Sequence, residues 1–486
     1  MNKKLGFLIN EKMHPYFFWA LVFIRGIFNY GLPLMDKTEA RYAEIARIMS
    51  ETGNWVVPHI DYGIPFWAKP PLSTWASALS VYLFGDHAFF VRLPYLLLSI
   101  CIGLFLGRYN KKKSPYLPGI LLLCLPEFYI HAGVVSTDLF LSFSIGLIML
   151  SFWEALQDKS KFWWGYLFFL GIGLGLLAKG PIVILLTLPP IGLWCLFTKN
   201  IRKSLITAPW IFGTFLCITL SIPWYYLAEM KSPGFIDYFI IGEHFERYFN
   251  SNWQGDKYGF PKQQPWGIVW LFFIAFILPW SVLLVRLLIN KRSLIWHDSW
   301  ALFLVTWMLW PLLFFTSSKS LIHPYVLPSM IPVALFLIHF WENVKSKKTY
   351  LGISFGIPLT LLFLFLSGLT KPLYENNTDK YLLEELNPLI PIYSLDQKTY
   401  SSQFYTQGRI KVIDKPQLEE LIRKKSAFYI CITNGKKETL SADLMTSLEL
   451  LKQQKKSMLY SFGLKNNTFY NKSKEKPKGR DNKESQ

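Results

Sequence analysis

The sequence predicts an all-α polytopic membrane protein with a small α/β domain outside the membrane at its C-terminal end. Hydrophobic residues make up 52% of the 486 residues, and the mean hydropathy is +0.26. Several apolar runs reach 17 residues or more, which is long enough for a helix to approach the thickness of a bilayer. After about Lys371 the chain becomes polar, and short strand and helix patterns replace the long apolar runs.

The apolar runs predict about eleven membrane spans. The first run, 15–35, is expected to be an uncleaved span rather than a signal peptide, because it is long and lacks a small-residue cleavage pattern. A run at 71–85 is short for a crossing and is interpreted as interfacial. The other runs lie near 88–107, 115–135, 138–156, 162–178, 181–198, 205–228, 265–288, 300–316, 323–341 and 350–369.

The net charge of +19 does not indicate a nucleic-acid partner, because the basic residues form short clusters between apolar runs and in the C-terminal tail. Such clusters are typical of topology determinants and of contacts to anionic lipid. If the N-terminus is cytoplasmic and 71–85 does not cross, every strongly basic connection lies inside. The polar segments that then share the outer face are 36–70, 136–138, 179–181, 229–264 and 317–323. The five cysteines show no metal-ligand spacing and no disulfide framework.

The loop expected at 36–85 on the outer face is the polar segment where we expect the chemistry. Its residues 38–52 alternate charged and apolar side chains with a helical period, which predicts an amphipathic helix on the membrane surface. Gly53 ends this helix, and the proline-rich run 58–71 is interpreted as an irregular loop that returns Lys69 to the bilayer.

Two carboxylates open the predicted surface helix. Asp36 and Glu39 have the spacing of a capping box, in which Asp36 caps the helix and Glu39 reaches back to its start. The same position orients a carboxylate well for base chemistry, so a structural role and a catalytic role both remain open.

Two lysines at span ends, Lys69 and Lys179, are either snorkelling anchors or ligands of a phosphorylated lipid headgroup. Asp138 is either the N-cap of the next span or part of the same site. Glu243 and His244 lie in the long outer loop and give only a weak indication of a metal site. The segment 319–328 contains Lys319, His323 and Tyr325 and also fits a simple turn.

The soluble region is predicted to contain strands near 390–395, 410–413, 428–433 and 458–462, with helices at 416–425 and 441–452. We therefore divide the chain into a transmembrane domain (1–371), an α/β domain (372–471) and a charged, disordered tail (472–486). An odd number of spans places the α/β domain on the outer side.

An ordered set of strings resembles the 4-amino-4-deoxy-L-arabinose transferase branch of the GT-C membrane glycosyltransferases, to which the dolichyl-phosphate-mannose protein mannosyltransferases are related. The likeness covers roughly residues 15–345, and the C-terminal domain is similar in placement and size. The strings are TEARYAEIARIMSETGNWVVP, PFWAKPPLSTW, STDLFLSF, GLLAKGP, GEHFERYF and SKSLIHPYVLPSMIP.

The resemblance implies a GT-C fold with about 11 to 13 transmembrane helices and transfer of a sugar from a polyprenyl phosphate, such as undecaprenyl phosphate, at the periplasmic face of the bacterial inner membrane. An acidic residue of the family at the reaction centre matches Asp36 or Glu39. The resemblance implies the following positions for the donor phosphate: Lys69, Arg41 and Lys179. It implies these as further active-site residues: Asp138, Glu243, His244, Lys319 and Tyr325.

No cofactor is required by the resemblance, although a divalent metal at His244 is compatible with it. This chain has Ala68 where the arabinose-transferring members usually have Glu. The implied acceptor is lipid A or another glycolipid. A protein O-mannosyltransferase of the same fold is an alternative, and a transporter of lipid-linked sugars is an alternative from another class. Against the transporter, the chain shows no internal repeat, and its polar groups lie at span ends rather than at the bilayer midplane.

Overall fold

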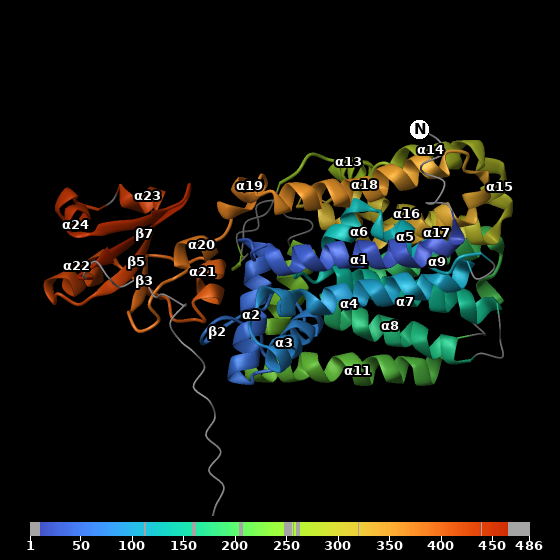
Figure 1. Ribbon diagram of the computed structural model, residues 1–486. Coiled ribbons are helices and arrows are strands. Elements are labelled where there is room, and N and C mark those ends of the chain that lie inside the picture. Colours follow the sequence, from blue (N-terminus) through green and yellow to red (C-terminus); the bar gives the residue numbers. More distant parts are fainter. Residues whose placement is uncertain are drawn as a thin grey trace, which may run out of the picture. The chain divides into compact units, whose positions relative to one another are not determined.

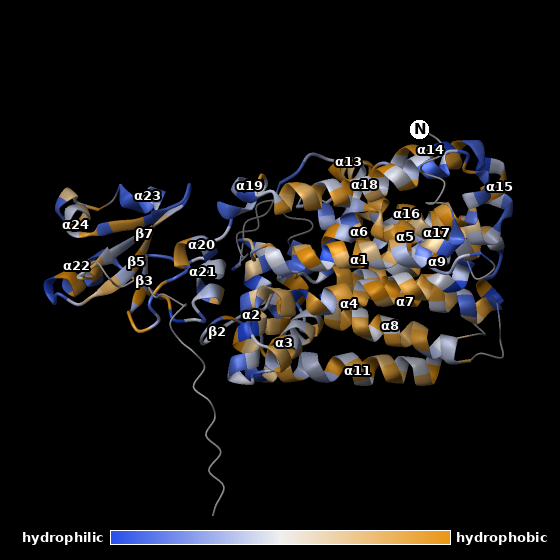
Figure 2. Ribbon diagram, viewed as in Figure 1, coloured by the Kyte–Doolittle hydropathy of each residue, from blue (hydrophilic) through white to orange (hydrophobic). Residues whose placement is uncertain are grey.

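The computed structural model describes residues 10–110, 113–157, 162–203, 208–246, 255, 257–258, 263–318, 320–438 and 440–464. The chain forms two compact units. The first comprises Met1–Leu32 and Ile45–Gly368, and the second comprises Pro33–Glu44 and Leu369–Gln486. Figures 1 and 2 show apolar helices throughout the first unit and a more polar, mixed structure in the second. The predicted disordered tail lies outside the described residues.

The first unit is built from helices. Its elements up to η4, apart from α2, are η2 (Glu11–Met13), α1 (His14–Gly31), β1 (His59–Asp61), β2 (Ile64–Pro65), α3 (Leu72–Phe84), α4 (Ala88–Leu106), η3 (Gly107–Asn110), α5 (Leu117–Leu123), α6 (Pro126–His131), α7 (Asp138–Gln157), α8 (Trp163–Lys179), α9 (Ile182–Thr198), α11 (Trp210–Lys231) and η4 (Asp237–Glu246). The elements that follow are α13 (Ile268–Phe276), α14 (Trp280–Asn290), α15 (Arg292–His297), α16 (Ser299–Thr316), η5 (His323–Ser329), α17 (Met330–His339), η6 (Trp341–Asn343) and α18 (Lys347–Leu366).

Within the described residues, five helices are long and apolar enough to cross a bilayer, or six if the bent pair α13 and α14 is one span. The five are Ala88–Asn110, Asp138–Gln157, Trp210–Lys231, Ser299–Thr316 and Lys347–Leu366. The sequence-based count of about eleven is therefore reached only if shorter apolar helices also cross.

Prolines break two of the predicted spans. The run 115–135 divides into α5 and α6 at Pro126, and the run 265–288 bends by 109° between α13 and α14, where Pro279 precedes α14. Proline has no amide hydrogen and its ring clashes with the preceding turn, so a helix ends or bends there. Both runs were predicted as single spans, and neither forms one continuous helix.

The helix α2 (Thr38–Thr52) has the predicted bounds but not the predicted surroundings. Five consecutive residues, 45–49, are buried, and they cover more than a full turn. Ala46 and Met49 pack with Ala78 of α3. The half of α2 that belongs to the first unit is thus enclosed and does not lie on a surface with one face exposed. The following loop also departs from prediction, because β1 and β2 form a short antiparallel hairpin within 58–71.

The helix α8 makes close contacts through glycines. A β-carbon at Gly171 would lie 2.7 Å from the Ile148 side chain of α7, and one at Gly175 would lie 2.4 Å from the Val183 side chain of α9. These distances are shorter than van der Waals contact, so the two neighbours approach α8 only because both positions lack a side chain. Figure 1 shows α7, α8 and α11 running side by side.

The second unit contains a five-stranded mixed sheet. Its elements are α19 (Lys371–Glu375), α20 (Lys380–Leu383), β3 (Ile392–Leu395), α21 (Tyr400–Tyr405), β4 (Lys411–Ile413), α22 (Lys415–Arg423), β5 (Phe428–Thr433), α23 (Asn434–Lys437), α24 (Ala442–Ser447), β6 (Glu449–Gln453) and β7 (Ser457–Phe462). The strand order is β4-β3-β5-β7-β6, in which β3 is parallel to β4 and β5, and β7 is antiparallel to β5 and β6.

The central strand β5 is buried on both faces, as its continuous apolar run predicts. Phe428, Ile430 and Ile432 enter one core cluster, whereas Tyr429 and Cys431 enter the other. The four predicted strands are all present. The predicted helix 441–452 is wrong in its second half, because β6 forms there and pairs with β7. Pairing with β7 stabilises a strand at this position, which the local periodicity of the sequence did not predict.

We predict that Gly175→Ala destabilises the first unit. The added methyl group must displace Val183, and overpacking of this kind costs about 1–3 kcal/mol. Thermal unfolding of the detergent-solubilised protein should therefore show a lower midpoint. The control is Gly192→Ala in α9, where a β-carbon has no neighbour within 4 Å. Alanine is favoured over glycine in a helix by about 0.5–1 kcal/mol, so a midpoint lowered equally in both variants would contradict the packing explanation.

Candidate active site

Two lysine–carboxylate pairs lie at the ends of helices in the first unit. Lys69, in the segment between β2 and α3, contacts Glu243 of η4 with 2.7 Å between Nζ and Oε2. Lys179, the last residue of α8, contacts Asp138, the first residue of α7, with 2.5 Å between Nζ and Oδ1. The Glu243 side chain is only 2% exposed and that of Lys69 17%. Charges this deeply buried require partners, and each pair supplies them.

His244 of η4 lies between the two pairs, and Tyr325 of η5 contacts the second pair. The ammonium of Lys179 lies 4.7 Å from the centre of the Tyr325 ring of η5, within cation–π range. His244 packs beside Gly180, the residue after Lys179, where a β-carbon would be 3.2 Å from the His244 ring. Gly180 has φ +84°, which favours glycine. Predicted site residues from five separate segments therefore form one contiguous polar cluster.

The electrostatics of His244 favour its neutral form. Burial lowers the pKa of the imidazole, and the positive charge of Lys69 acts in the same direction. Its Nδ1 lies 2.8 Å from the Phe239 carbonyl oxygen, which can only accept, so Nδ1 carries the proton.

The weak metal prediction at His244 finds no support. Across the described residues there is no group of three or more His, Cys, Asp or Glu side chains arranged to hold a metal ion. Glu243, the neighbour that would assist His244, is bound to Lys69, and the Nδ1 of His244 faces a carbonyl. These residues do not fit a metal, and no step below uses one.

A second carboxylate centre was not recognised from the sequence. Glu127 of α6 is fully buried, and its carboxylate accepts hydrogen bonds of 2.9 and 3.0 Å from Nδ1 of His323 in η5. His131, one turn along α6, lies 3.3 Å from the same carboxylate. The signal that predicts this centre is an acidic residue inside the apolar run 115–135, since an ionisable group in such a run is a functional hypothesis by default.

The predicted site residues at the start of α2, which are Asp36, Glu39 and Arg41, belong to the second unit. Glu39 accepts a 3.4 Å hydrogen bond from the Met35 amide, one residue before the predicted cap, whereas the Asp36 amide donates to the Asn377 carbonyl oxygen at 2.8 Å. Arg41 lies over the rings of Tyr42 and Tyr400. Lys319 lies outside the described residues.

Asp36 does not cap α2. Its Oδ1 accepts a 3.0 Å hydrogen bond from the Ser401 amide, and its Oδ2 contacts the Ser401 hydroxyl. Ser401 also contacts Thr399, which donates to the buried Asp379. Asp36 is thus fastened to the C-terminal part of its own unit, which corrects the capping prediction.

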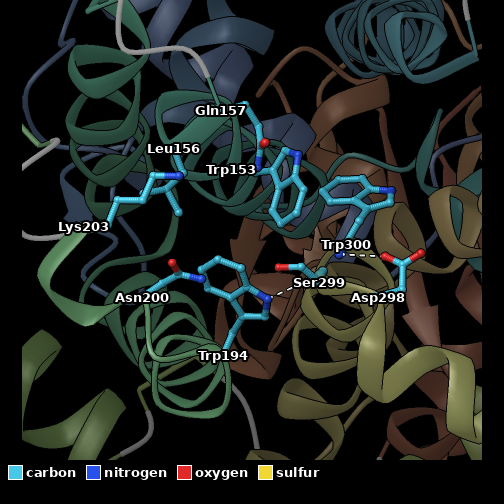
Figure 3. A pocket seen from close by; sticks show the side chains of 9 residues that line it. All are labelled: Trp153, Leu156, Gln157, Trp194, Asn200, Lys203, Asp298, Ser299 and Trp300. Carbon is cyan, nitrogen blue, oxygen red and sulfur yellow. Dashed lines mark hydrogen bonds between the residues drawn. The ribbon is translucent and has the colours of Figure 1, made fainter.

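Figure 3 shows a separate pocket of about 410 Å³. It lies at the C-terminal end of α7, whereas Asp138 begins that helix. The 20 residues of α7 span about 30 Å. The pocket is lined by Trp153, Leu156, Gln157, Trp194, Asn200, Lys203, Asp298, Ser299 and Trp300. None of the predicted site residues lines it, so the lysine cluster and not this pocket is the candidate active site.

Comparisons with known proteins identify one matching family model and several relatives by sequence. A family model described as dolichyl-phosphate-mannose-protein mannosyltransferase matches residues 17–239. An undecaprenyl phosphate-alpha-4-amino-4-deoxy-L-arabinose arabinosyl transferase 2 from Pseudomonas fluorescens (strain Pf0-1) is 27% identical over 395 residues, covering 75% of this chain and 68% of the relative. The corresponding transferase of Wigglesworthia glossinidia brevipalpis is 30% identical over 365 residues, with coverages of 71% and 62%. The chain thus spans roughly two thirds of these curated relatives.

A solved structure has the same fold. The crystal structure of ArnT from Cupriavidus metallidurans bound to undecaprenyl phosphate matches 92% of this chain and 97% of its own, with a TM-score of 0.73 and 16% sequence identity. At this identity the likeness concerns the fold. Together with the candidate spans, it identifies a multi-pass membrane protein.

We predict that Asp36 makes the stability of the protein depend on pH. Burial raises the pKa of Asp36 from 3.8 to about 6, partly opposed by the hydrogen bonds from Ser401. A carboxyl group whose pKa is higher in the folded state contributes stability that is fully present below 3.8 and is lost as the pH rises through about 6. The wild-type unfolding midpoint should therefore fall relative to that of Asp36→Asn between pH 4 and pH 6.

The control for this experiment is Asp443→Asn, which changes an exposed carboxylate of α24. Its midpoint should follow the wild type at each pH. Parallel curves for wild type and Asp36→Asn would show that Asp36 has no raised pKa in the folded protein.

Proposed function

We propose that this chain, which belongs to the GT-C membrane glycosyltransferases that include the aminoarabinose transferases and the dolichyl-phosphate-mannose protein mannosyltransferases, transfers a monosaccharide from a polyprenyl phosphate to an envelope acceptor. By analogy with the named relatives, the donor is undecaprenyl phosphate-aminoarabinose and the acceptor is lipid A or another glycolipid. The observation that carries the proposal is the cluster formed by the Lys69–Glu243 and Lys179–Asp138 pairs.

The paired lysines suit the leaving group of this reaction. A sugar phosphate ester that loses its sugar develops negative charge on the phosphate oxygen, and preorganised cations stabilise that charge in the transition state. Each lysine is paired with a carboxylate before the donor binds, so the bundle does not hold an uncompensated positive charge. The phosphate takes the place of a carboxylate oxygen at the ammonium group. Arg41 is the third proposed phosphate ligand.

The proposed chemistry is an inverting displacement. The acceptor oxygen forms a bond to the anomeric carbon, the bond from that carbon to the phosphate oxygen breaks, and its electron pair stays on the phosphate. Asp36 or Glu39 orients the acceptor. A phosphate acceptor is already ionised at neutral pH, whereas a hydroxyl acceptor must also lose a proton. His244, Tyr325 and Lys319 complete the proposed site.

The proposed membrane topology follows from the distribution of charged residues along the sequence. The shorter apolar helices, such as α3, α8, α9 and the pair η5–α17, have lengths below a full crossing but high apolar content. If these helices except α3 cross the membrane, and α1, the α5–α6 pair and the bent α13–α14 pair each cross it once as well, the chain has eleven spans. The basic connections then face the cytoplasm, and the site faces the periplasm of a bacterial inner membrane. The α/β domain at 372–471 is then on the periplasmic side.

Replacing the lysines tests donor binding. We predict that Lys69→Gln and Lys179→Gln each weaken binding of the polyprenyl phosphate about 10- to 100-fold, because a hydrogen bond to a charged group contributes about 1.5–3 kcal/mol. Titration of the purified protein with the polyprenyl phosphate measures this change. Lys436→Gln is the control, because that lysine pairs with Asp396 in the second unit. Unchanged affinity in both site variants would remove the lysines from the donor site.

Release of free polyprenyl phosphate from a labelled polyprenyl-phosphate sugar, supplied with lipid A, tests the reaction itself. We predict that the wild type releases the carrier only with an acceptor present. We further expect that one of Asp36→Asn and Glu39→Gln loses release while it retains donor binding. Binding without release in every version, with lipid and protein acceptors alike, would favour a transporter of lipid-linked sugars.

A further inference from the structure

The Glu127–His323 pair has no part in the phosphate chemistry above, yet it has the geometry of an acid–base dyad. Both carboxylate oxygens of Glu127 face Nδ1 of His323, at 2.9 and 3.0 Å. An ionised carboxylate only accepts hydrogen bonds, so Nδ1 carries the proton and Nε2 of the neutral ring carries a lone pair. This is the tautomer that a general base requires.

The free nitrogen of His323 is available to a ligand. In the described part of the chain Nε2 has no hydrogen-bond partner, and the His323 side chain is 40% exposed, whereas the Glu127 side chain has no exposure. The imidazole stacks on Phe276 of α13, with 4.7 Å between ring centres and 10° between planes. The ring is therefore held at one nitrogen and along one face, while its other nitrogen is left open.

The dyad lies beside the proposed phosphate site. His323 and Tyr325 are two residues apart in η5, so their Cα atoms are separated by at most about 7.6 Å. Tyr325 contacts the ammonium of Lys179. The segment that begins with α6 also leads directly into Asp138, the partner of Lys179. The η5 segment thus supplies His323 to the dyad and Tyr325 to Lys179. The segment from α6 to the start of α7 supplies Glu127 to the dyad and Asp138 to Lys179.

We propose that His323, oriented by Glu127, is the general base that removes the proton from a hydroxyl acceptor, and that the acceptor of this enzyme is therefore a hydroxyl group. This inference rests on the proposed function. The acceptor O–H bond breaks and its proton moves to Nε2 of His323. The acceptor oxygen bonds to the anomeric carbon, and the electron pair of the broken carbon–oxygen bond leaves with the polyprenyl phosphate. Asp36 and Glu39 then serve in orientation.

The charged and titratable groups around His323 come from several elements. Glu127 and His131 belong to α6, with 5.9 Å between the rings of His131 and His323. Phe276 of α13 carries no charge. Asp138, Lys179 and Tyr325 form the neighbouring pair and its aromatic contact. The carboxylate of Glu127 stabilises the imidazolium that forms when the acceptor proton arrives, which lowers the barrier to proton transfer.

The first test compares rates of carrier release over a range of pH. General-base catalysis contributes about 10²- to 10⁴-fold, so His323→Gln should lose at least about 100-fold in kcat and should lose the acidic limb of the pH–rate profile. Its affinity for the polyprenyl phosphate should stay within about twofold of wild type. Glu127→Gln should lower kcat about tenfold or more, because the glutamine no longer holds the proton on Nδ1 of His323. Added imidazole should partly restore the activity of His323→Gly.

A matched control is available in the same chain. His339 of α17 contacts the carboxylate of Asp298, the N-cap of α16, with 2.7 Å between Nε2 and Oδ2. It is another histidine–carboxylate pair, and the 18 residues of α16, about 27 Å, separate Asp298 from the end that leads to η5. His339→Gln should keep the wild-type rate and pH profile.

A second measurement does not depend on the rate. Diethyl pyrocarbonate modifies accessible imidazole nitrogens, and mass spectrometry locates the adducts. A hydroxyl acceptor, added with donor analogue, should protect His323 and leave His339 equally modified.

Each contrary outcome is distinct. Wild-type protein that binds donor but never releases the carrier would remove both the proposed function and this inference. Normal transfer with His323→Gln within twofold of wild type, or with an unchanged acidic limb, would overturn the base role alone. Transfer to a phosphate acceptor, with only the acceptor KM raised in His323→Gln, would make His323 an anion-binding residue instead.

Discussion

An apolar helix bundle tolerates an ionised side chain only where a second group compensates it, and this constraint organises the first unit. The cost of an isolated charge in such surroundings is several kcal/mol even after relaxation. Each compensating pair joins residues far apart in sequence. Lys179 and Asp138 are 41 residues apart, Lys69 and Glu243 are 174 apart, and His323 and Glu127 are 196 apart. The pairs are satisfied together only when the helix ends that carry them meet, so the same contacts specify the packing and assemble the site.

The sequence contains some of this organisation in local form. The bounds of α2 follow from the period of its apolar residues, and β5 follows from a short continuous apolar run. Lys69, Lys179 and Asp138 stand out because charged residues at the ends of apolar runs are unusual. None of these signals identifies a partner, because periodicity describes one segment at a time. For that reason Glu243 was predicted as a site residue but not as the partner of Lys69. Glu127, which lies inside an apolar run, was not predicted as a site residue.

The errors have the same origin. The amphipathic pattern of α2 is compatible with a membrane surface or with a buried position, and only the packing of Ala46 and Met49 against Ala78 decides between them. Asp36 has the spacing of a cap, but a serine 365 residues away offers better hydrogen bonds. The strand β6 exists because β7 presents an edge to it. In each case a contact with another segment overrides a sound local preference.

The glycine contacts of α8 bear on how such an enzyme changes its specificity. Because Gly171 and Gly175 leave no room for a side chain, α8 packs closely against α7 and α9, and this packing sets where its last residue, Lys179, lies. In the proposed site, this lysine binds the phosphate that all polyprenyl carriers share. Divergence toward new sugars or acceptors must therefore accumulate in connecting segments such as 132–137 and 317–322. A library directed at those segments can search for altered acceptors while the phosphate site stays intact.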